Sequence, residues 1–226
     1  MISITNNILC RASAKKRNGA GFTLIELLTV IAIIGILAGI IIPTTGAVRT
    51  SAKKAKARSQ FSQWATGFTL FKQEYGYFPQ VTTTATNRII DPAKFIGALS
   101  GKDYLGVPIT PITSASLAGN KKRSSFYSFS DDDLLRSAAG VTLNEVIDAF
   151  DNSQIAMLID VDNDGLIKDS ATEFVKQNLR SGNSVKSLGA TITPPAANFP
   201  SDGVRLGVAF YSVGKGDKDT DMVYSW

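Results

Sequence analysis

A long apolar run at residues 22–42 is the dominant pattern in the sequence. As a helix rising about 1.5 Å per residue, it is long enough to cross a hydrocarbon core about 30 Å thick. Its one ionisable residue is Glu26, and a carboxylate at bilayer depth costs about 3 kcal/mol unless it is paired. The pattern therefore predicts a membrane-spanning helix in which Glu26 has a partner or a purpose.

Beyond Pro43 an amphipathic pattern continues the helix. Apolar residues recur every three or four positions with Lys, Arg, Ser and Gln between them, which is typical of a helix with one buried stripe. The expected stripe consists of Ala52, Ala55, Phe61, Trp64, Ala65, Phe68, Phe71 and Tyr75. Gly76 and Pro79 end the pattern, so we expect a spine helix of about 50 residues, half in the membrane and half in a globular head.

The rest of the chain predicts a small α+β head. Asp91 and Pro92 are suited to the N-cap and first turn of a short helix that ends before Gly101. Three later segments rich in apolar or aromatic side chains are predicted strands: residues 125–129, 155–161 and 205–213. Residues 182–203, rich in Ser, Gly, Pro and Asn, predict a surface loop. A helix followed by strands favours a small antiparallel sheet packed on the spine helix.

The segment before the apolar run differs in charge from the rest. It holds four basic residues and no acidic one, which leaves 20 Lys and Arg against 19 Asp and Glu in the remainder. By the positive-inside rule, this arrangement predicts a cytoplasmic N-terminus and an extracytoplasmic head. An ordinary secretory signal has its small-residue cleavage site after the apolar stretch, whereas here Gly19, Ala20 and Gly21 come before it.

The residues around this site resemble those of a known family. The prepilin cleavage and methylation motif of type IV pilins and type II secretion pseudopilins is similar to the run Gly21-Phe22-Thr23-Leu24-Ile25-Glu26. The resemblance implies a type IV pilin-like fold and a membrane peptidase that cuts between Gly21 and Phe22. It also implies that the new amine of Phe22 is methylated and that the apolar helix stays attached to the mature protein.

Filament assembly would give Glu26 its purpose. The amine of Phe22 and the positive end of the helix attract a carboxylate, so Glu26 of one subunit can neutralise Phe22 of its neighbour and set the axial register. Gly35 and Gly39 let helices approach closely, and Pro43 removes one helical hydrogen bond and is expected to kink the chain. The chain then divides into a leader at 1–21, a transmembrane or filament-core helix at 22–45, and a head at 46–226 that includes the spine helix to about residue 75.

Two acidic clusters predict calcium sites. In the first, Asp160, Asp162 and Asp164 hold the first, third and fifth places of a loop with Gly165 at the sixth, which is the opening half of a calcium loop. The usual closing ligand is missing, although Glu173 could close a variant loop. The alternative is a plain turn, since Asp and Asn favour turns without any ion.

The second cluster lies near the C-terminus, where Asp217, Asp219 and Asp221 precede a Ser-Trp end. It resembles the calcium-binding C-terminal loop of major type II pseudopilins, although Lys215 and Lys218 depart from that pattern. An acidic hairpin turn is the alternative. In either cluster calcium would stabilise a loop and perform no chemistry.

Composition argues against an enzyme and against nucleic-acid binding. The chain has no His, and its single cysteine, Cys10, lies in the expected leader, which excludes histidine triads, His-ligated zinc and thiol catalysis by the mature protein. The mature chain also cannot form a disulfide, unlike many type IV pilins. The short basic cluster Lys53, Lys54, Lys56 and Arg58 is interpreted as a solvated helix face or a lipid headgroup contact, and no nucleic-acid partner is expected.

The sequence thus predicts a structural subunit. We expect a type II secretion pseudopilin that is a single-pass inner-membrane protein with a periplasmic head, and later part of a periplasmic or cell-surface homo-oligomeric filament. Its expected partners are prepilin peptidase, an inner-membrane assembly platform and other pilin-like subunits. The alternatives are a type IV pilin for adhesion, motility or DNA uptake and, in another class, a signal-anchored calcium-binding surface protein that does not assemble.

Overall fold

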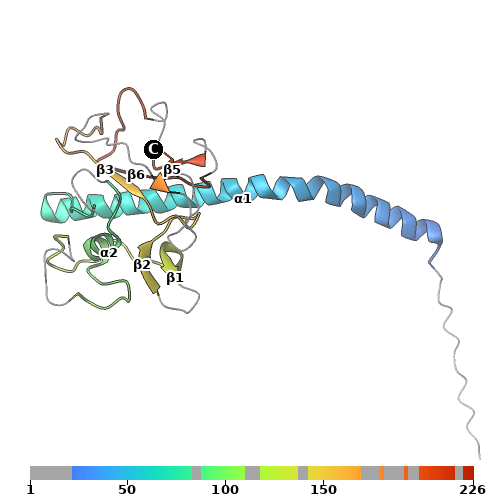
Figure 1. Ribbon diagram of the computed structural model, residues 1–226, viewed down its shortest axis with the longest axis horizontal. Helices are drawn as coiled ribbons and strands as arrows, with labels where there is room; N and C mark the ends of the chain where they lie inside the picture. The colour runs from blue at the N-terminus through green and yellow to red at the C-terminus, as the bar shows by residue number, and fades with distance from the viewer. Residues whose placement is uncertain are drawn as a thin grey trace, which may run out of the picture. The chain divides into compact units, whose positions relative to one another are not determined.

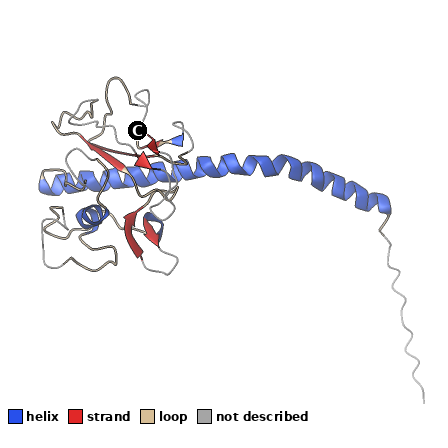
Figure 2. Cartoon of the chain, viewed as in Figure 1, coloured by secondary structure: helices blue, strands red, loops and turns tan. Residues whose placement is uncertain are grey.

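The chain divides into two units by its internal contacts. In the computed structural model, residues 22–82, 88–109, 118–136, 142–168, 179–180, 191–192, 199–216 and 221–226 are described. The first unit ends at Gly46, and the second, called the head below, runs from Ala47 to Trp226. Regular elements alternate with long loops in the head (Figure 2).

The helix α1 (Leu24–Tyr75) belongs to both units (Figure 1). Its 52 residues confirm the predicted spine helix, and its assignment is continuous through Pro43. The helix ends where Gly76 adopts a φ of +81°, a left-handed conformation that glycine tolerates best. Lys72 supplies the last carbonyl of the ladder, which accepts a hydrogen bond of 2.8 Å from the Gly76 N–H.

One face of the second half of α1 forms the centre of the head. Its members are fully buried and follow one another at spacings of three or four: Ala57, Phe61, Trp64, Phe68 and Phe71. The predicted aromatic stripe is thus confirmed, but Ala52 and Ala55 were wrongly included, because both are exposed. Nine residues at 3.6 per turn separate Ala52 from Phe61, which puts Ala52 on the opposite side of the helix.

The short helix α2 (Pro92–Ser100) covers this face, as its capping residues predict. The Asp91 carboxylate accepts hydrogen bonds from the backbone N–H groups of Ala93 and Lys94 at 3.1 and 3.2 Å, and Gly101 ends the helix in a left-handed conformation. The ring of Phe95 then lies 5.1 Å from that of Trp64, edge to face.

The predicted strand at 125–129 is wrong. The backbone N–H groups of Phe126 and Tyr127 both donate to the carbonyl of Leu99, at 2.7 and 3.1 Å, so the segment satisfies the end of α2 and pairs with no strand. Its aromatic residues reflect packing, because Phe126, Tyr127 and Phe129 lie against the main core. A strand and a partly buried loop can both be rich in aromatic residues, and the backbone hydrogen bonds show which of the two is present.

The main sheet has three antiparallel strands in the order β3 (Ala156–Ile159), β6 (Val208–Ser212) and β7 (Val223–Tyr224). The first two confirm the strands predicted at 155–161 and 205–213, in shortened form. Met157 faces Phe210 across the pair and turns with it toward α1, whereas Leu158 and Ala209 turn toward a second core. Both faces of the sheet are therefore buried, which explains why β6 is apolar without alternation.

Two further strand pairs and a short 3-10 helix complete the described elements. They are η1 (Asp131–Asp133), β1 (Leu134–Arg136) paired with β2 (Thr142–Val146), and β4 (Leu179–Arg180) paired with β5 (Thr191–Ile192). In Figure 1, α2 and the β1–β2 pair lie on one side of the head part of α1, and β3 and β6 lie on the other. The loop predicted at 182–203 therefore contains β5, while much of the rest of it lies outside the described residues.

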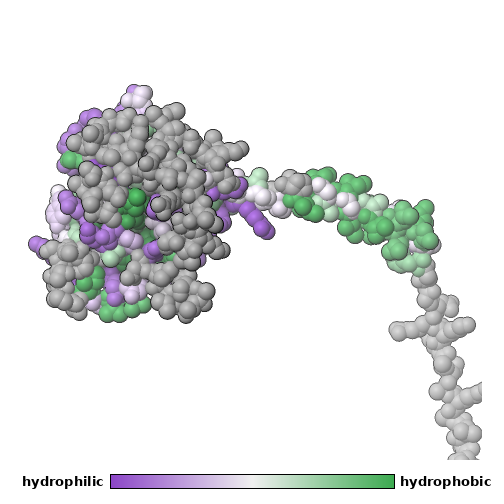
Figure 3. Space-filling model, viewed as in Figure 1, coloured by the Kyte–Doolittle hydropathy of each residue, from purple (hydrophilic) through white to green (hydrophobic). Residues whose placement is uncertain are grey.

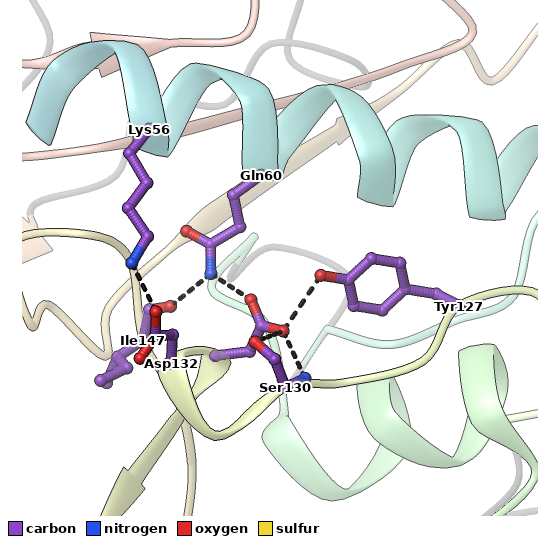
Figure 4. A network of polar contacts seen from close by, with 7 residues as sticks. Lys56, Gln60, Tyr127, Ser130, Asp132 and Ile147 are labelled. Carbon is purple, nitrogen blue, oxygen red and sulfur yellow. Dashed lines mark hydrogen bonds and ion pairs between the residues drawn. The ribbon is translucent and has the colours of Figure 1, made fainter. Parts of the chain in front are cut away.

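A polar network joins α1 to the η1–β1 segment (Figure 4). Gln60 is buried in α1 and donates to the Asp133 carboxylate at 2.7 Å and to the Ile147 carbonyl at 2.9 Å. The second Asp133 oxygen accepts from the Tyr127 hydroxyl at 3.0 Å and from the backbone and hydroxyl of Ser130 at 2.7 and 2.9 Å. Burial, and then the charge of Asp133, raises the pKa of the Tyr127 hydroxyl, which therefore stays a donor at physiological pH.

Replacing Trp64 with alanine should destabilise the head strongly. The substitution opens a cavity between Phe61, Phe95 and Phe210, and removing a buried Trp side chain costs about 3–5 kcal/mol. Denaturant titration followed by circular dichroism measures this loss. The matched control is Leu70→Ala on the same helix, where the side chain is 43% exposed, and an equal loss in both variants would contradict the proposed core.

Replacing Tyr127 with phenylalanine should weaken the network around Asp133. The change removes one hydrogen bond to a buried carboxylate while it keeps the ring, so we expect a loss of about 1.5 kcal/mol in the free energy of unfolding. The control Tyr77→Phe, at a residue that is 47% exposed, should change stability by less than about 0.5 kcal/mol. Equal effects of the two substitutions would show that the hydroxyl of Tyr127 has no special role.

Candidate functional site

The N-terminal half of α1 exposes nearly all of its apolar side chains. Figure 3 shows this stretch as a largely hydrophobic surface. Phe22 is 78% exposed, and large exposed side chains continue along the helix at Leu24, Ile25, Leu27, Leu28, Val30, Ile31, Ile33, Ile34, Ile36, Leu37, Ile40, Ile41 and Ile42. Among the described residues α1 is the one helix long and apolar enough to cross a membrane. A surface of this kind needs lipid or other protein chains to cover it.

Glu26 is the one charged residue of this segment, and it caps the start of its own helix. Its Oε2 accepts hydrogen bonds from the backbone N–H of Thr23 at 2.8 Å and from the Thr23 hydroxyl at 2.6 Å. In return the backbone N–H of Glu26 donates to the Thr23 hydroxyl oxygen at 3.3 Å. This reciprocal pattern is a capping box with Thr23 as N-cap. The spacing Thr-x-x-Glu could have predicted it, but our sequence analysis gave Glu26 a role in assembly alone.

Small residues leave room along the same half of α1. A Cβ atom added at Gly35 or Gly39 would meet no atom within 4 Å, so nothing in the structure occupies the space beside either glycine. Pro43 lies within α1, where it lacks the N–H group of a helical hydrogen bond. These features keep Gly35, Gly39 and Pro43 as candidate assembly residues.

The basic residues at the start of the head lie beside acidic residues from separate loops. Lys56 contacts Asp132 at 2.7 Å, Lys54 contacts Asp221 at 3.7 Å, and Lys53 contacts Asp151 at 3.9 Å. The interpretation of this cluster as a solvated face or a lipid contact is therefore incomplete. The Lys56 hydrogen bond lowers the pKa of the Asp132 carboxyl. The exposed pairs of Lys53 and Lys56 contribute about 0–1 kcal/mol each, so they orient the acidic segments more than they stabilise the head.

The structure brings the three aspartates of the first acidic cluster together. One carboxylate oxygen from each of Asp160, Asp162 and Asp164 lies within 4.8 Å of the others. Asp160 is buried, whereas Asp162 and Asp164 are exposed and both lie beside the ammonium group of Lys168. The hydrogen bond from Lys168 lowers the pKa of the Asp164 carboxyl. Glu173, the residue expected to close the loop, lies outside the described residues.

The second acidic cluster is described in part. Asp221 lies beside Lys54, while Asp217 and Asp219 lie outside the described residues, so this calcium site stays a prediction.

The start of the loop after β6 is held by hydrogen bonds. Asn152 donates to the carbonyl of Gly214 at 2.7 Å and to the buried carboxylate of Asp148 at 3.0 Å. The loop after β6 is thereby fixed to the body of the head.

The C-terminus is packed against the main sheet. The backbone N–H of Ser225 donates to the Phe210 carbonyl, and the Phe210 N–H donates to the Ser225 hydroxyl, both at 2.9 Å. The Trp226 ring lies 4.8 Å from that of Tyr224 and 6.0 Å from that of Phe199. The last residues thus contribute to the second core.

The comparisons with known proteins agree with the N-terminal geometry. A family model described as "Prokaryotic N-terminal methylation motif" matches residues 16–42. Neither the curated proteins nor the solved structures contain a match to the chain. The motif supports a type IV pilin-like protein that is processed by a prepilin peptidase, and it indicates a structural subunit. The exposed apolar helix suggests a single-pass membrane anchor, as in pilin-like proteins. Gly21, on the leader side of the expected cleavage point, lies outside the described residues.

Proposed function

We propose that the protein is a structural subunit of a type II secretion pseudopilus. In this proposal the peptidase cuts between Gly21 and Phe22 and methylates the amine of Phe22. The processed subunit then leaves the membrane through an inner-membrane assembly platform and joins a helical filament. The observation that carries the proposal is the methylation motif at the start of α1, whose N-terminal half is apolar and exposed and has one charge.

The exposed half of α1 supports two successive environments. Before assembly lipid covers its apolar side chains, and after assembly the same half-helices of neighbouring subunits cover them. Gly35 and Gly39 offer space for a close approach between helices. A contact that repeats from one subunit to the next without closing on itself produces a filament.

Glu26 has free capacity for a partner beyond its own helix. Both hydrogen bonds that the Glu26 carboxylate accepts from Thr23 go to Oε2, and a carboxylate has two oxygens with about four acceptor positions in all. The cap orients the side chain at the N-terminal end of the helix, beside the place where cleavage creates a new ammonium group. A neighbour's Phe22 amine is therefore the proposed partner, and the pair would form away from water, where it sets register.

The choice between secretion pseudopilus and type IV pilus rests on the sequence of the head. The mature chain has no cysteine, whereas many type IV pilins have a C-terminal disulfide. The Asp-rich loop and the Ser-Trp end resemble those of major pseudopilins. The packing of Tyr224 and Trp226 on the sheet supports a head that closes without a disulfide.

Processing should give a mature protein that begins at methylated Phe22. Intact and N-terminal peptide mass spectrometry of membrane-extracted protein measures both events. Gly21→Val should abolish cleavage, since the peptidase needs the small residue next to the cut, while the matched change Gly19→Val should allow it. Retention of Met1, or cleavage beyond Ile42, would contradict the proposal and favour the anchored or secreted alternative.

Assembly should depend on the charge of Glu26. Glu26→Gln keeps a side chain that fits a capping box but removes the charge, and loss of one partner from a buried ion pair costs about 3–5 kcal/mol. In the native host we expect a processed, membrane-anchored protein, with sheared filaments and protein export both reduced at least about tenfold. Glu74→Gln, the same change at an exposed residue of α1, should leave both unchanged.

The alternatives predict different results for the Glu26→Gln variant, for a deletion strain and for the overproduced wild type. Unchanged filaments in Glu26→Gln would contradict the role of the charge. Normal export in a deletion strain that has lost surface pili would favour the type IV pilin. Absence of filaments from the wild type, even when it is overproduced with its export machinery, would favour the anchored protein that does not assemble.

A further inference from the structure

The loop that follows β3 is held at one end by the main sheet and at the other by an isolated β-bridge. The backbone N–H of Asp160 donates to the Gly207 carbonyl at 3.0 Å, which extends the pairing of β3 with β6. On the far side of the loop, Ile167 and Val204 exchange two backbone hydrogen bonds of 2.8 and 2.9 Å. The six residues between Asp160 and Ile167 therefore form a loop of fixed span.

Inside this loop the backbone folds the three carboxylates toward one another. Asn163 and Gly165 both adopt left-handed conformations, with φ of +60° and +87°. The N–H of Gly165 donates to Asp160 Oδ2 at 2.9 Å, and the N–H of Asp164 donates to Asp162 Oδ1 at 3.2 Å. These bonds account for the shape of the loop but bring three negative charges together, which is unfavourable by itself.

One oxygen of this cluster is buried and lacks a donor. Asp160 is 3% exposed, and its Oδ1 has no hydrogen-bond partner among the described residues. One oxygen of the same Asp160 carboxylate lies within 4.8 Å of an oxygen of each of the other two aspartates, so this incompletely hydrogen-bonded carboxylate is part of the cluster. A buried carboxylate oxygen without a partner is costly, and a bound cation is one standard explanation for it.

We propose that this loop is a calcium site in which Asp160, Asp162 and Asp164 are the protein's carboxylate ligands. The donor set consists of oxygen atoms only, which suits a hard cation, and carboxylates at the first, third and fifth places with glycine at the sixth match the first half of an EF-hand loop. Leu166 stands at the seventh place, where such loops use a backbone carbonyl.

Lys168 would compete with a bound ion for the carboxylates of Asp162 and Asp164. Its ammonium group lies 3.7 Å from Asp162 and forms a second ion pair with Asp164, while its side chain is half exposed. The buried carboxylate of Asp160 accepts the Gly165 N–H at Oδ2, while its Oδ1 has no donor among the described residues. Calcium displaces the ammonium from Asp162 and Asp164, and its two positive charges offset two of the three negative charges of the cluster. Removal of Lys168 should therefore tighten binding, whereas removal of a carboxylate should weaken it.

Binding at this loop would also act on α1. The ammonium of Lys72 donates to the Asn163 side-chain carbonyl at 2.5 Å and lies 4.5 Å above the ring of Phe78. The loop therefore contacts the last turn of α1 within the head. An ion that orders the loop would stabilise this contact, so the site would raise the thermal stability of the head as a whole.

Calorimetric titration of the full chain in detergent tests the proposal. The protein is first stripped of metal with a chelator, and calcium chloride is then the probe. We expect one binding event at this loop with a Kd of about 0.1–1 mM, typical of extracellular calcium modules, and a higher melting temperature with calcium than with an equal concentration of magnesium. Asp164→Asn should raise the Kd about tenfold or more, and Lys168→Gln should lower it several-fold.

Further Asp→Asn variants keep the result clear. Asp162 and Asp164 are exposed, so their Asn variants should fold even if Asp160→Asn does not. Asp132→Asn makes the same charge change at an exposed residue outside the loop and should leave the Kd unchanged. An unchanged Kd in both Asp162→Asn and Asp164→Asn would overturn the proposal, as would a loss of binding confined to Asp221→Asn, which would place the ion in the C-terminal loop. The outcome does not depend on whether the protein assembles.

Discussion

Burial of one aromatic face of α1 is the interaction on which the rest of the head depends. Trp64 contacts Phe95 of α2 and Phe210 of β6, and these two rings lie 6.0 Å from each other. The helix therefore serves as the central element around which α2 and the main sheet pack. Because residues 22–226 contain no cysteine, this core and the buried polar network around Gln60 hold the head together without a disulfide.

The two halves of α1 differ in which side chains they expose, and their sequences differ accordingly. Between Phe22 and Arg49 the helix has one charged residue and exposed apolar side chains, so it is stable where lipid or other helices surround it. From Ala57 onward it buries a narrow stripe and exposes polar residues. Glu26 does not contradict the first environment, because its carboxylate accepts a hydrogen bond from the Thr23 N–H at the start of the helix, and an unpaired N–H group would be costly in lipid.

The sequence predicted those elements whose signals are local. The period of α1, the Asp91 cap of α2 and the apolar runs of β3 and β6 all follow from neighbouring residues. The segment at 125–129 was misassigned because its aromatic side chains pack against α1 and α2, which are distant in sequence. The strands β1 and β7 have three and two residues, too few to show a pattern. In the acidic loop, spacing identified Asp160, Asp162 and Asp164, but the burial of Asp160 and the approach of Lys168 depend on the folded sheet.

The position of Phe210 has a consequence for biogenesis. The aromatic face of α1 is the first part of the head to be synthesised, whereas β6 and β7 are among the last. Contacts between residues so distant in sequence form slowly and late. In a nascent chain the sides of Phe61, Trp64 and Phe68 that contact Phe210 therefore stay uncovered until nearly the whole polypeptide has been synthesised. Chaperones and proteases would act on the incompletely folded head during this time, and a prematurely terminated chain would remain a substrate for degradation.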